Sequence, residues 1–253
     1  MALYKKICMM VALMWCGMTA VGAQTLAGQA GEAYQRGDYA EAIALYEQSA
    51  AQEGVSAAFY YNLGNAYYKS GLYPNAILNY ERALLLSPGD PDIRFNLQMA
   101  RSKTIDKITP ETEMFFVTWY RSLINLTSVD GWARTALVIL ALAIVLALVY
   151  LFTEPVWLRK LGFFGALVLL VCFVVANVFA YTQKQSFVNR NGAIIMAPAV
   201  TVKSTPSKQG TDLFILHEGT KVEITDGAMR QWKRIRLADG KEGWLETSQI
   251  EII

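Results

Sequence analysis

The residue types that most often carry out acid–base or nucleophilic chemistry are sparse in this sequence. His217 is the only histidine, and Cys8, Cys16 and Cys172 all fall in apolar segments away from it in the chain. A Cys/His pair needs a cysteine that the histidine can activate, so that chemistry is excluded. A Ser/His/Asp set that uses His217 stays open, beside the favoured interpretation of a strand-edge histidine that is hydrogen-bonded locally.

Other catalytic and ligand-binding patterns are also missing. A zinc site would lack its nitrogen and sulfur ligands, and neither a Gly-x-x-x-x-Gly-Lys-Ser/Thr phosphate loop nor a Gly-x-Ser-x-Gly nucleophile elbow occurs. The 23 basic and 21 acidic side chains are interspersed, giving a net charge of +2 and no basic patch for nucleic acid. We therefore expect a protein that is not an enzyme and has no catalytic residue, cofactor, metal or nucleic-acid partner.

The polar stretches alternate with strongly apolar ones. Apolar residues make up 54% of the chain and charged residues 17%, whereas about 45–50% is the usual apolar share of a soluble domain. At the N terminus, Lys5 and Lys6 precede an apolar run over residues 7–21, and Val21-Gly22-Ala23 has the pattern that signal peptidase cuts. Residues 1–23 are therefore predicted to be a secretory signal peptide, with an uncleaved anchor as the alternative.

Two later segments, residues 133–152 and 161–181, are each long and apolar enough to cross a bilayer as a helix. The alternative, a buried hairpin in a globular core, would need amphipathic elements to cover it. The loop between them, residues 153–160, contains Arg159 and Lys160 and is predicted to be cytoplasmic, because basic loops are retained inside. Together with an exported N terminus, this predicts a bacterial inner-membrane protein of two spans with periplasmic N- and C-terminal domains.

Residues 109–132 are predicted to include an interfacial linker helix ahead of the first span. Aromatic and aliphatic side chains recur there at helical spacing, and aromatic rings partition well at a membrane surface. Packing of the same face against the preceding helical domain is an equally open alternative. The side chains concerned are Phe115, Phe116, Trp119, Tyr120, Leu123 and Ile124.

Residues 24–108 contain a repeat with a period of 34. Gly37-Asp38-Tyr39 returns as Gly71-Leu72-Tyr73, with matching small and aromatic residues after each. This period and pattern resemble the tetratricopeptide repeat, which forms one helix-turn-helix hairpin per copy. The second copy is the more complete, and a third begins at Asp90 and is expected to cap the stack. The matching residues of the second copy are Tyr60, Leu63, Gly64, Tyr67, Ala76, Tyr80, Ala83 and Pro88.

Tetratricopeptide arrays bind extended peptides or partner helices along a concave face formed by the first helix of each repeat. Aromatic and hydrogen-bonding side chains on that face suit peptide recognition. An equally open alternative is that these residues do not bind a partner and occur there because they are common in such helices. The predicted partner-binding residues are Tyr34, Tyr61, Asn65, Tyr68 and Lys69.

Residues 187–253 show the alternation of apolar and polar residues, broken by glycine and proline, that predicts several short strands. Trp232-Lys233-Arg234-Ile235-Arg236 and Asp239-Gly240-Lys241-Glu242-Gly243-Trp244 resemble a bacterial SH3-like domain, a small all-β barrel. That resemblance implies binding of peptides or cell-wall material, with Trp232 and residues 205–210 as a candidate ligand surface. The favoured alternative is that Trp232 belongs to the core.

The order of these parts predicts a multidomain membrane protein and resembles the BatE proteins of the bacterial aerotolerance operon. The resemblance also includes Val129-Asp130-Gly131-Trp132 at the entry to the first span. It implies a membrane complex with von Willebrand factor A-domain proteins and a MoxR-type ATPase, with a role in oxygen or stress tolerance. Two hypotheses follow: a scaffold that gathers protein partners, or a sensor whose SH3-like domain binds a cell-wall peptide or small ligand.

Overall fold

The computed structural model describes residues 25–188 and 190–253. The predicted signal peptide, residues 1–23, and with it Cys8 and Cys16, lies outside the described residues. The chain divides into two compact units, with the boundary between Gly54 and Val55. Each unit is described by itself.

The first unit contains one helical hairpin, made of α2 (Leu26–Gln35) and α3 (Tyr39–Glu53). Hydroxyl and carboxylate side chains cap both helices: Thr25 accepts a hydrogen bond from the Gly28 amide, and Asp38 accepts one from the Glu41 amide. The connecting turn uses Gly37 at φ +83°, a backbone conformation that glycine adopts without steric cost.

The second unit begins with a hairpin of the same kind, made of α4 (Ala57–Lys69) and α5 (Tyr73–Leu86), followed by α6 (Pro91–Arg101). Gly71 in the turn has φ +77° and repeats the role of Gly37. At Gly64 an added Cβ atom would lie 2.7 Å from the Tyr80 ring, so only glycine allows α4 and α5 to approach this closely. The predicted repeat of helical hairpins is confirmed.

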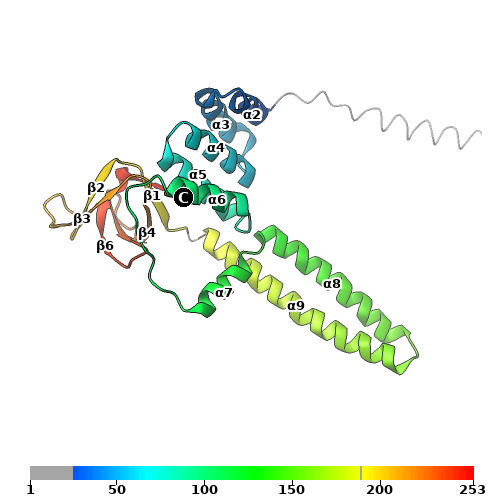
Figure 1. Ribbon diagram of the computed structural model, residues 1–253. Coiled ribbons are helices and arrows are strands. Elements are labelled where there is room, and N and C mark those ends of the chain that lie inside the picture. Colours follow the sequence, from blue (N-terminus) through cyan, green and yellow to red (C-terminus); the bar gives the residue numbers. More distant parts are fainter. Residues whose placement is uncertain (1–24, 189) are drawn as a thin grey trace, which may run out of the picture. The chain divides into compact units, whose positions relative to one another are not determined.

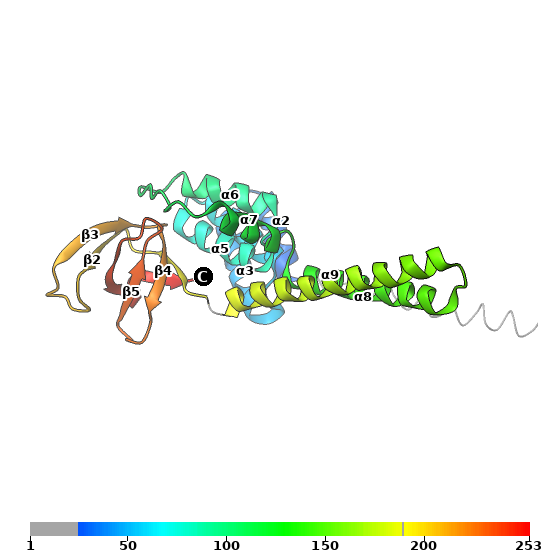
Figure 2. The ribbon, with the colours of Figure 1, turned by 90° about the horizontal axis from the view of Figure 1, so that it is seen from below.

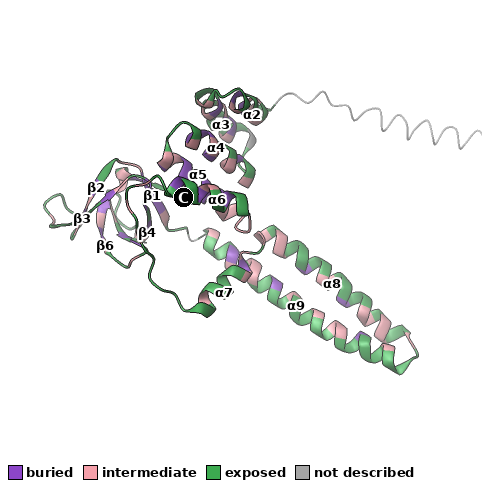
Figure 3. Ribbon diagram, in the orientation of Figure 1, coloured by how far each residue is buried: buried purple, intermediate pink, exposed green. Residues whose placement is uncertain are grey.

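Three further helices follow: α7 (Phe115–Ile124), α8 (Val129–Phe152) and α9 (Val156–Val188). Helices α8 and α9 form an antiparallel hairpin joined by residues 153–155, as Figures 1 and 2 both show. Most of their large apolar side chains are exposed, and Figure 3 colours much of both helices as exposed. At about 1.5 Å per residue, α8 is about 36 Å long, and both helices are long and apolar enough to cross a membrane.

Small residues form the contact between α8 and α9. Ala136, Ala143 and Ala176 are buried there, and an added Cβ atom at Gly162 would lie 2.7 Å from the Leu146 carbonyl oxygen. Small residues inside and large apolar residues outside are the arrangement by which helices associate in lipid. A soluble protein buries its large apolar residues instead.

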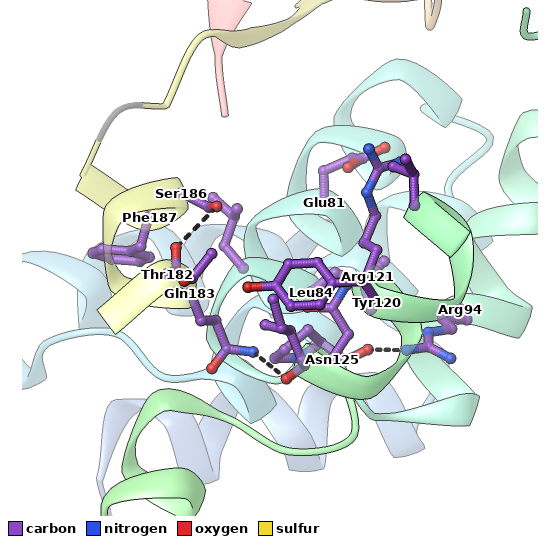
Figure 4. Close-up of a pocket in the computed structure, with 14 residues that line it drawn as sticks. Glu81, Leu84, Arg94, Tyr120, Arg121, Asn125, Thr182, Gln183, Ser186 and Phe187 are labelled. Atoms are coloured by element: carbon purple, nitrogen blue, oxygen red, sulfur yellow. Dashed lines mark hydrogen bonds between the residues drawn. The ribbon is translucent and has the colours of Figure 1, made fainter. Parts of the chain in front are cut away.

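The turn between α7 and α8 is fastened to the start of α8 and the end of α9. The Trp132 indole donates to the Ile124 carbonyl over 2.8 Å. The buried Gln183 amide donates to the carbonyls of Ile124 and Thr127 over 3.2 and 2.9 Å, and Figure 4 draws the Gln183 side chain. Ring contacts of Tyr120 and Trp132 with Phe179 add to this junction. It borders a cavity of about 510 Å³ between α5, α7 and α9.

The C-terminal part is a seven-stranded antiparallel sheet in the order β3-β2-β6-β5-β4-β1-β7. Gly240, at φ +83°, turns the chain from β5 to β6 as the Asp239-Gly240 pair predicts. The apolar core beneath includes Ile195, Val202, Ile235 and Leu245. The strands are β1 (Gly192–Ile195), β2 (Ala199–Lys203), β3 (Asp212–His217), β4 (Lys221–Asp226), β5 (Trp232–Arg236), β6 (Glu242–Glu246) and β7 (Ile250–Ile252).

The sheet is open, in contrast to the closed barrel that the sequence pattern predicts. Strands β3 and β7 are its two edges and do not pair with each other. Helix α5 contacts the β7 edge instead: the Arg82 guanidinium donates to the Ile252 carbonyl over 2.7 Å and pairs with Glu251. A charged side chain that binds an edge carbonyl takes the place of a further strand.

Candidate partner-binding surface

Four polar side chains from three helices of the second unit form one hydrogen-bond network. The Tyr80 hydroxyl of α5 donates to Asn65 Oδ1 of α4 over 2.7 Å. Asn96 Nδ2 of α6 donates to the same oxygen over 2.9 Å and to the Tyr61 hydroxyl over 3.0 Å. The network therefore fixes the orientation of the Tyr61 ring and the Asn65 amide, both only half-buried, on the side of α4 that faces α6.

The structure brings together two of the five predicted partner-binding residues, Tyr61 and Asn65. Tyr68 lies instead at the other end of α4, with its ring centre 5.5 Å from that of Tyr73. Lys69 is exposed at the last position of α4. Tyr34 belongs to the first unit, where its ring centre lies 5.4 Å from that of Tyr39. The pairs Tyr34/Tyr39 and Tyr68/Tyr73 are thus the same intra-hairpin contact, one repeat apart.

Helix α6 adds three residues that the sequence interpretation missed. Asn96 completes the network, while Phe95 and Met99 project into solvent with 64% and 41% of their surface exposed. The period of 34 contained the signal for two of them, because Phe95 follows Tyr61 and Met99 follows Asn65 at that spacing. We define the α4–α6 face as the following residues: Tyr61, Asn65, Phe95, Asn96 and Met99.

Helix α5, by contrast, is covered by the sheet. Glu81, whose side chain is only 7% exposed, pairs with Lys221 of β4 over 2.7 Å and with Arg101 of α6. Two cations offset the cost of burying this carboxylate. An added Cβ atom at Gly219 would lie 3.2 Å from Ile77 of α5, which shows how closely the β3–β4 turn approaches the helix. Within residues 55–253, the sheet occupies α5 and leaves the α4–α6 face open.

The extended segment after α6 also contacts the sheet, and we call residues 106–111 the linker clasp. Asp106 Oδ2 accepts hydrogen bonds from the His217 backbone amide and the Thr220 hydroxyl, both over 2.7 Å. Asp106 Oδ1 lies 2.8 Å from His217 Nδ1. Further along, Ile108 packs against the apolar core of the sheet, and the Glu111 amide donates to the Ala238 carbonyl over 2.8 Å.

The surroundings of Asp106 act on its pKa in two directions. Partial burial by itself raises the pKa, because the charged form loses hydration. The hydrogen bonds from the His217 backbone, the Thr220 hydroxyl and the His217 ring outweigh burial, with help from the charge of His217. The net result is a pKa of Asp106 below its ordinary value of 3.8. The clasp is therefore built around an ionised carboxylate.

The other predicted ligand surface, on the sheet itself, consists of Trp232 and residues 205–210. Trp232 begins β5, is half-buried, and lies opposite Glu246 of β6 in the strand register. Lys208, in the loop between β2 and β3, has its Nζ atom 3.7 Å from Glu246 Oε1. Glu246 therefore connects the loop with the strand pair that carries Trp232.

The same contacts define the chemical setting of His217. Its pairing with Asp106 reproduces two members of a Ser/His/Asp arrangement. Within residues 25–188 and 190–253, however, no hydroxyl or thiol group is hydrogen-bonded to His217 Nε2, where a nucleophile would have to be. In this described part of the chain there is also no group of three or more His, Cys, Asp or Glu residues placed to hold a metal ion.

Comparison with known proteins identifies one part of the chain. A family model described as the tetratricopeptide repeat matches residues 28–91, which run from α2 to the first residue of α6. No curated protein is similar enough to count as a match. Residues 28–91 thus form a tetratricopeptide-repeat region, a type of module that serves protein–protein interaction.

Proposed function

We propose that this chain is a non-catalytic membrane adaptor that gathers protein partners through the α4–α6 face of its tetratricopeptide-repeat region. The observation that carries the proposal is the unequal covering of the second repeat. Helix α5 is covered by the sheet through Ile77, Glu81 and Arg82. On the α4–α6 face, by contrast, Phe95 and Met99 remain exposed, next to the hydrogen-bond network around Asn65.

The chemistry of the α4–α6 face suits an extended peptide or a partner helix. The network holds Asn65, Tyr61 and Asn96 in fixed orientations, so little side-chain entropy is lost when a partner binds. Phe95 and Met99 supply apolar contact area, and thioether and aromatic side chains are frequent in adaptable binding surfaces. Apolar anchors beside oriented amides are the usual composition of such a site.

The proposed anchor is the α8–α9 hairpin, placed as two spans of the bacterial inner membrane. Support comes from the exposed apolar side chains and the seam of small residues between the helices. Arg159 and Lys160 lie near the 153–155 turn and favour a cytoplasmic turn. Because both helix ends at the opposite side of the hairpin lead to polar domains, the repeats and the sheet would share the periplasm.

Single-cysteine labelling tests this topology in a Cys8→Ser/Cys16→Ser/Cys172→Ser background. A membrane-impermeant maleimide should label Ser204→Cys, in the loop after β2, in spheroplasts with intact inner membranes. Glu154→Cys, in the turn between α8 and α9, should be labelled only after the membrane is opened. Labelling of both positions in intact spheroplasts would contradict a two-span hairpin.

The resemblance to BatE proteins extends the proposal to particular partners. It suggests von Willebrand factor A-domain membrane proteins and a MoxR-type ATPase as members of the complex, which would contribute to aerotolerance or stress resistance. The sheet would then be the SH3-like domain of that family. This extension of the proposal is supported by the order of repeats, apolar helices and β domain, together with the Trp132 contact at the entry to α8.

A second candidate function is a sensor that binds a cell-wall peptide or small ligand through the sheet. The observation that favours it is the approach of Lys208 to Glu246, which joins the 205–210 loop to the strand pair carrying half-buried Trp232. Isothermal titration calorimetry of the intact protein with soluble cell-wall fragments tests this function. Binding that Trp232→Ala removes would favour the sensor over the adaptor.

The adaptor function is tested by crosslinking the protein to its partners in cells. The variant Asn65→Ala/Phe95→Ala changes the α4–α6 face, leaves the sheet intact, and should lose the crosslinked partners. Tyr68 is left unchanged in this variant, because its ring contacts Tyr73 of the same hairpin. Retention of all partners by this variant would mean that another part of the chain binds them.

A further inference from the structure

The linker clasp joins two parts of the chain that are far apart in sequence. Asp106 and His217 are separated by 111 positions, and both apolar helices α8 and α9 lie between them. The contact therefore does not arise from local chain connection. It depends on complementarity between a short extended segment and one end of the sheet.

Three features of the clasp match the way that proteins bind extended peptides. Asp106 provides a carboxylate that is met by a backbone amide, a hydroxyl and an imidazole. Ile108, two residues on, provides an apolar side chain that packs against the core of the sheet. The Glu111 amide provides a backbone bond to Ala238, at the turn between β5 and β6. Main-chain bonds with alternate side-chain contacts are typical of peptide recognition at a sheet.

The receiving side includes one buried hydroxyl group, that of Thr220. Thr220 has only 6% of its surface exposed, and its hydroxyl is directed to Asp106. Gly219, at φ +82°, sets the β3–β4 turn that presents the His217 amide and the Thr220 hydroxyl together. A hydroxyl at this depth needs a hydrogen-bond partner, so the site requires a carboxylate or an equivalent acceptor.

The clasp also borders open space. A cavity of about 890 Å³ is lined by Asp106, Ile108, Thr220 and Leu237, among others. An external peptide could therefore approach the contacts that the linker makes. The linker competes with such a peptide for the site. Because the linker is covalently attached, its effective concentration is in the millimolar range, as for a short flexible connection.

We propose that this end of the sheet is a binding site for an extended acidic peptide of the pattern acidic–x–apolar, and that residues 106–111 are its resident ligand within the chain. A partner segment with the same pattern displaces the linker and takes over the bonds to His217 and Thr220. This site differs from the surface around Trp232, because it lies at the β3–β4 and β5–β6 turns. It also does not depend on the α4–α6 face.

The test uses the full chain in lipid nanodiscs and a fluorescent peptide with the sequence of residues 103–112, followed by fluorescence anisotropy. Two variants vacate the site: Asp106→Asn, which keeps the shape of the linker, and Asp106→Ala/Ile108→Ala. Both should bind the peptide at least tenfold more tightly than the wild-type chain, in which the linker competes. A peptide with asparagine in place of Asp106 should not show this gain.

Receptor variants complete the test in the Asp106→Asn background. Thr220→Val removes the hydroxyl at nearly constant shape and should abolish the gain in affinity, whereas Thr220→Ser should retain it. Equal peptide binding by the wild-type and Asp106→Asn chains would overturn the proposal. Peptide binding that is unchanged by Thr220→Val would overturn it as well, because the carboxylate contact would then have no role.

Discussion

Asn96 Nδ2 donates a hydrogen bond over 2.9 Å to the Asn65 oxygen that also accepts the Tyr80 hydroxyl. One amide oxygen of α4 thus joins α5 and α6, so α6 is positioned by polar as well as apolar contacts. The same Asn96 amide reaches the Tyr61 hydroxyl. The residues that orient the α4–α6 face therefore also hold α6 against the second repeat.

Replacing Asn96 with alanine should lower the free energy of unfolding of the repeat region by about 1 kcal/mol, the usual worth of a net hydrogen bond. Chemical denaturation of the detergent-solubilised chain, followed by far-UV circular dichroism, measures this change. Gln98→Ala on the exposed side of α6 is the matched control and should leave the midpoint unchanged. Equal effects of the two substitutions would show that the network does not stabilise α6.

Gly64→Ala should destabilise the second repeat by about 1–3 kcal/mol, the usual cost of overpacking a core. The added Cβ atom would lie 2.7 Å from the Tyr80 ring, and Tyr80 is itself fully buried and hydrogen-bonded to Asn65. Gly31→Ala is the control in the first repeat, where the nearest atom would be 3.9 Å away. There the higher helix propensity of alanine should give no loss, or a gain of up to about 1 kcal/mol. Thermal unfolding of both variants distinguishes these outcomes.

The linker clasp should make stability depend on pH in the acidic range. Hydrogen bonds lower the pKa of Asp106 in the folded chain below 3.8, so the ionised form is favoured by folding. Its contribution is present above the unfolded pKa and is lost as the pH falls through the lower, folded pKa. The difference in thermal unfolding between wild type and Asp106→Asn should therefore be largest well above pH 3.8 and should shrink as the pH falls below 3.8. A difference that is constant from pH 7 to pH 3 would contradict the charged clasp.

Gln183→Ala should loosen the junction between α7 and α8, because the buried amide bonds the carbonyls of both Ile124 and Thr127. Limited trypsin digestion in nanodiscs should then cleave after Arg121 at least several times faster. Gln185→Ala is the matched control, since the Gln185 amide bonds Tyr181 within the same helix. Equal cleavage rates in the two variants would mean that Gln183 does not fasten the turn.

The sequence was most informative where structure depends on local spacing. The 34-residue period predicted the hairpins and placed Tyr61 and Asn65 on one face, since residues at fixed helical spacing share a side. It grouped Tyr68 with them as well, but spacing alone does not indicate that the Tyr68 ring contacts Tyr73. The Asp239-Gly240 pair likewise predicted a hairpin turn that the structure contains.

Contacts between distant segments had no signal in the sequence. Asp106 lies in a polar stretch like many others, and nothing in its neighbours indicates His217 or Thr220 as partners. Closure of the sheet was predicted from strand rhythm, but closure depends on how the edges pair, and at β7 Arg82 binds the edge instead. The signal peptide, the topology and the named partners remain predictions.

The central claim is that the α4–α6 face binds protein partners, and in-cell crosslinking with mass spectrometry tests it most directly. Wild type is compared with Asn65→Ala/Phe95→Ala and with Leu213→Ala/Ile215→Ala, a control that removes exposed apolar side chains from the β3 edge. We expect von Willebrand-type membrane partners to be lost only from the α4–α6 variant, at unchanged protein level and far-UV circular dichroism. Recovery of the same partners with all three proteins would contradict it.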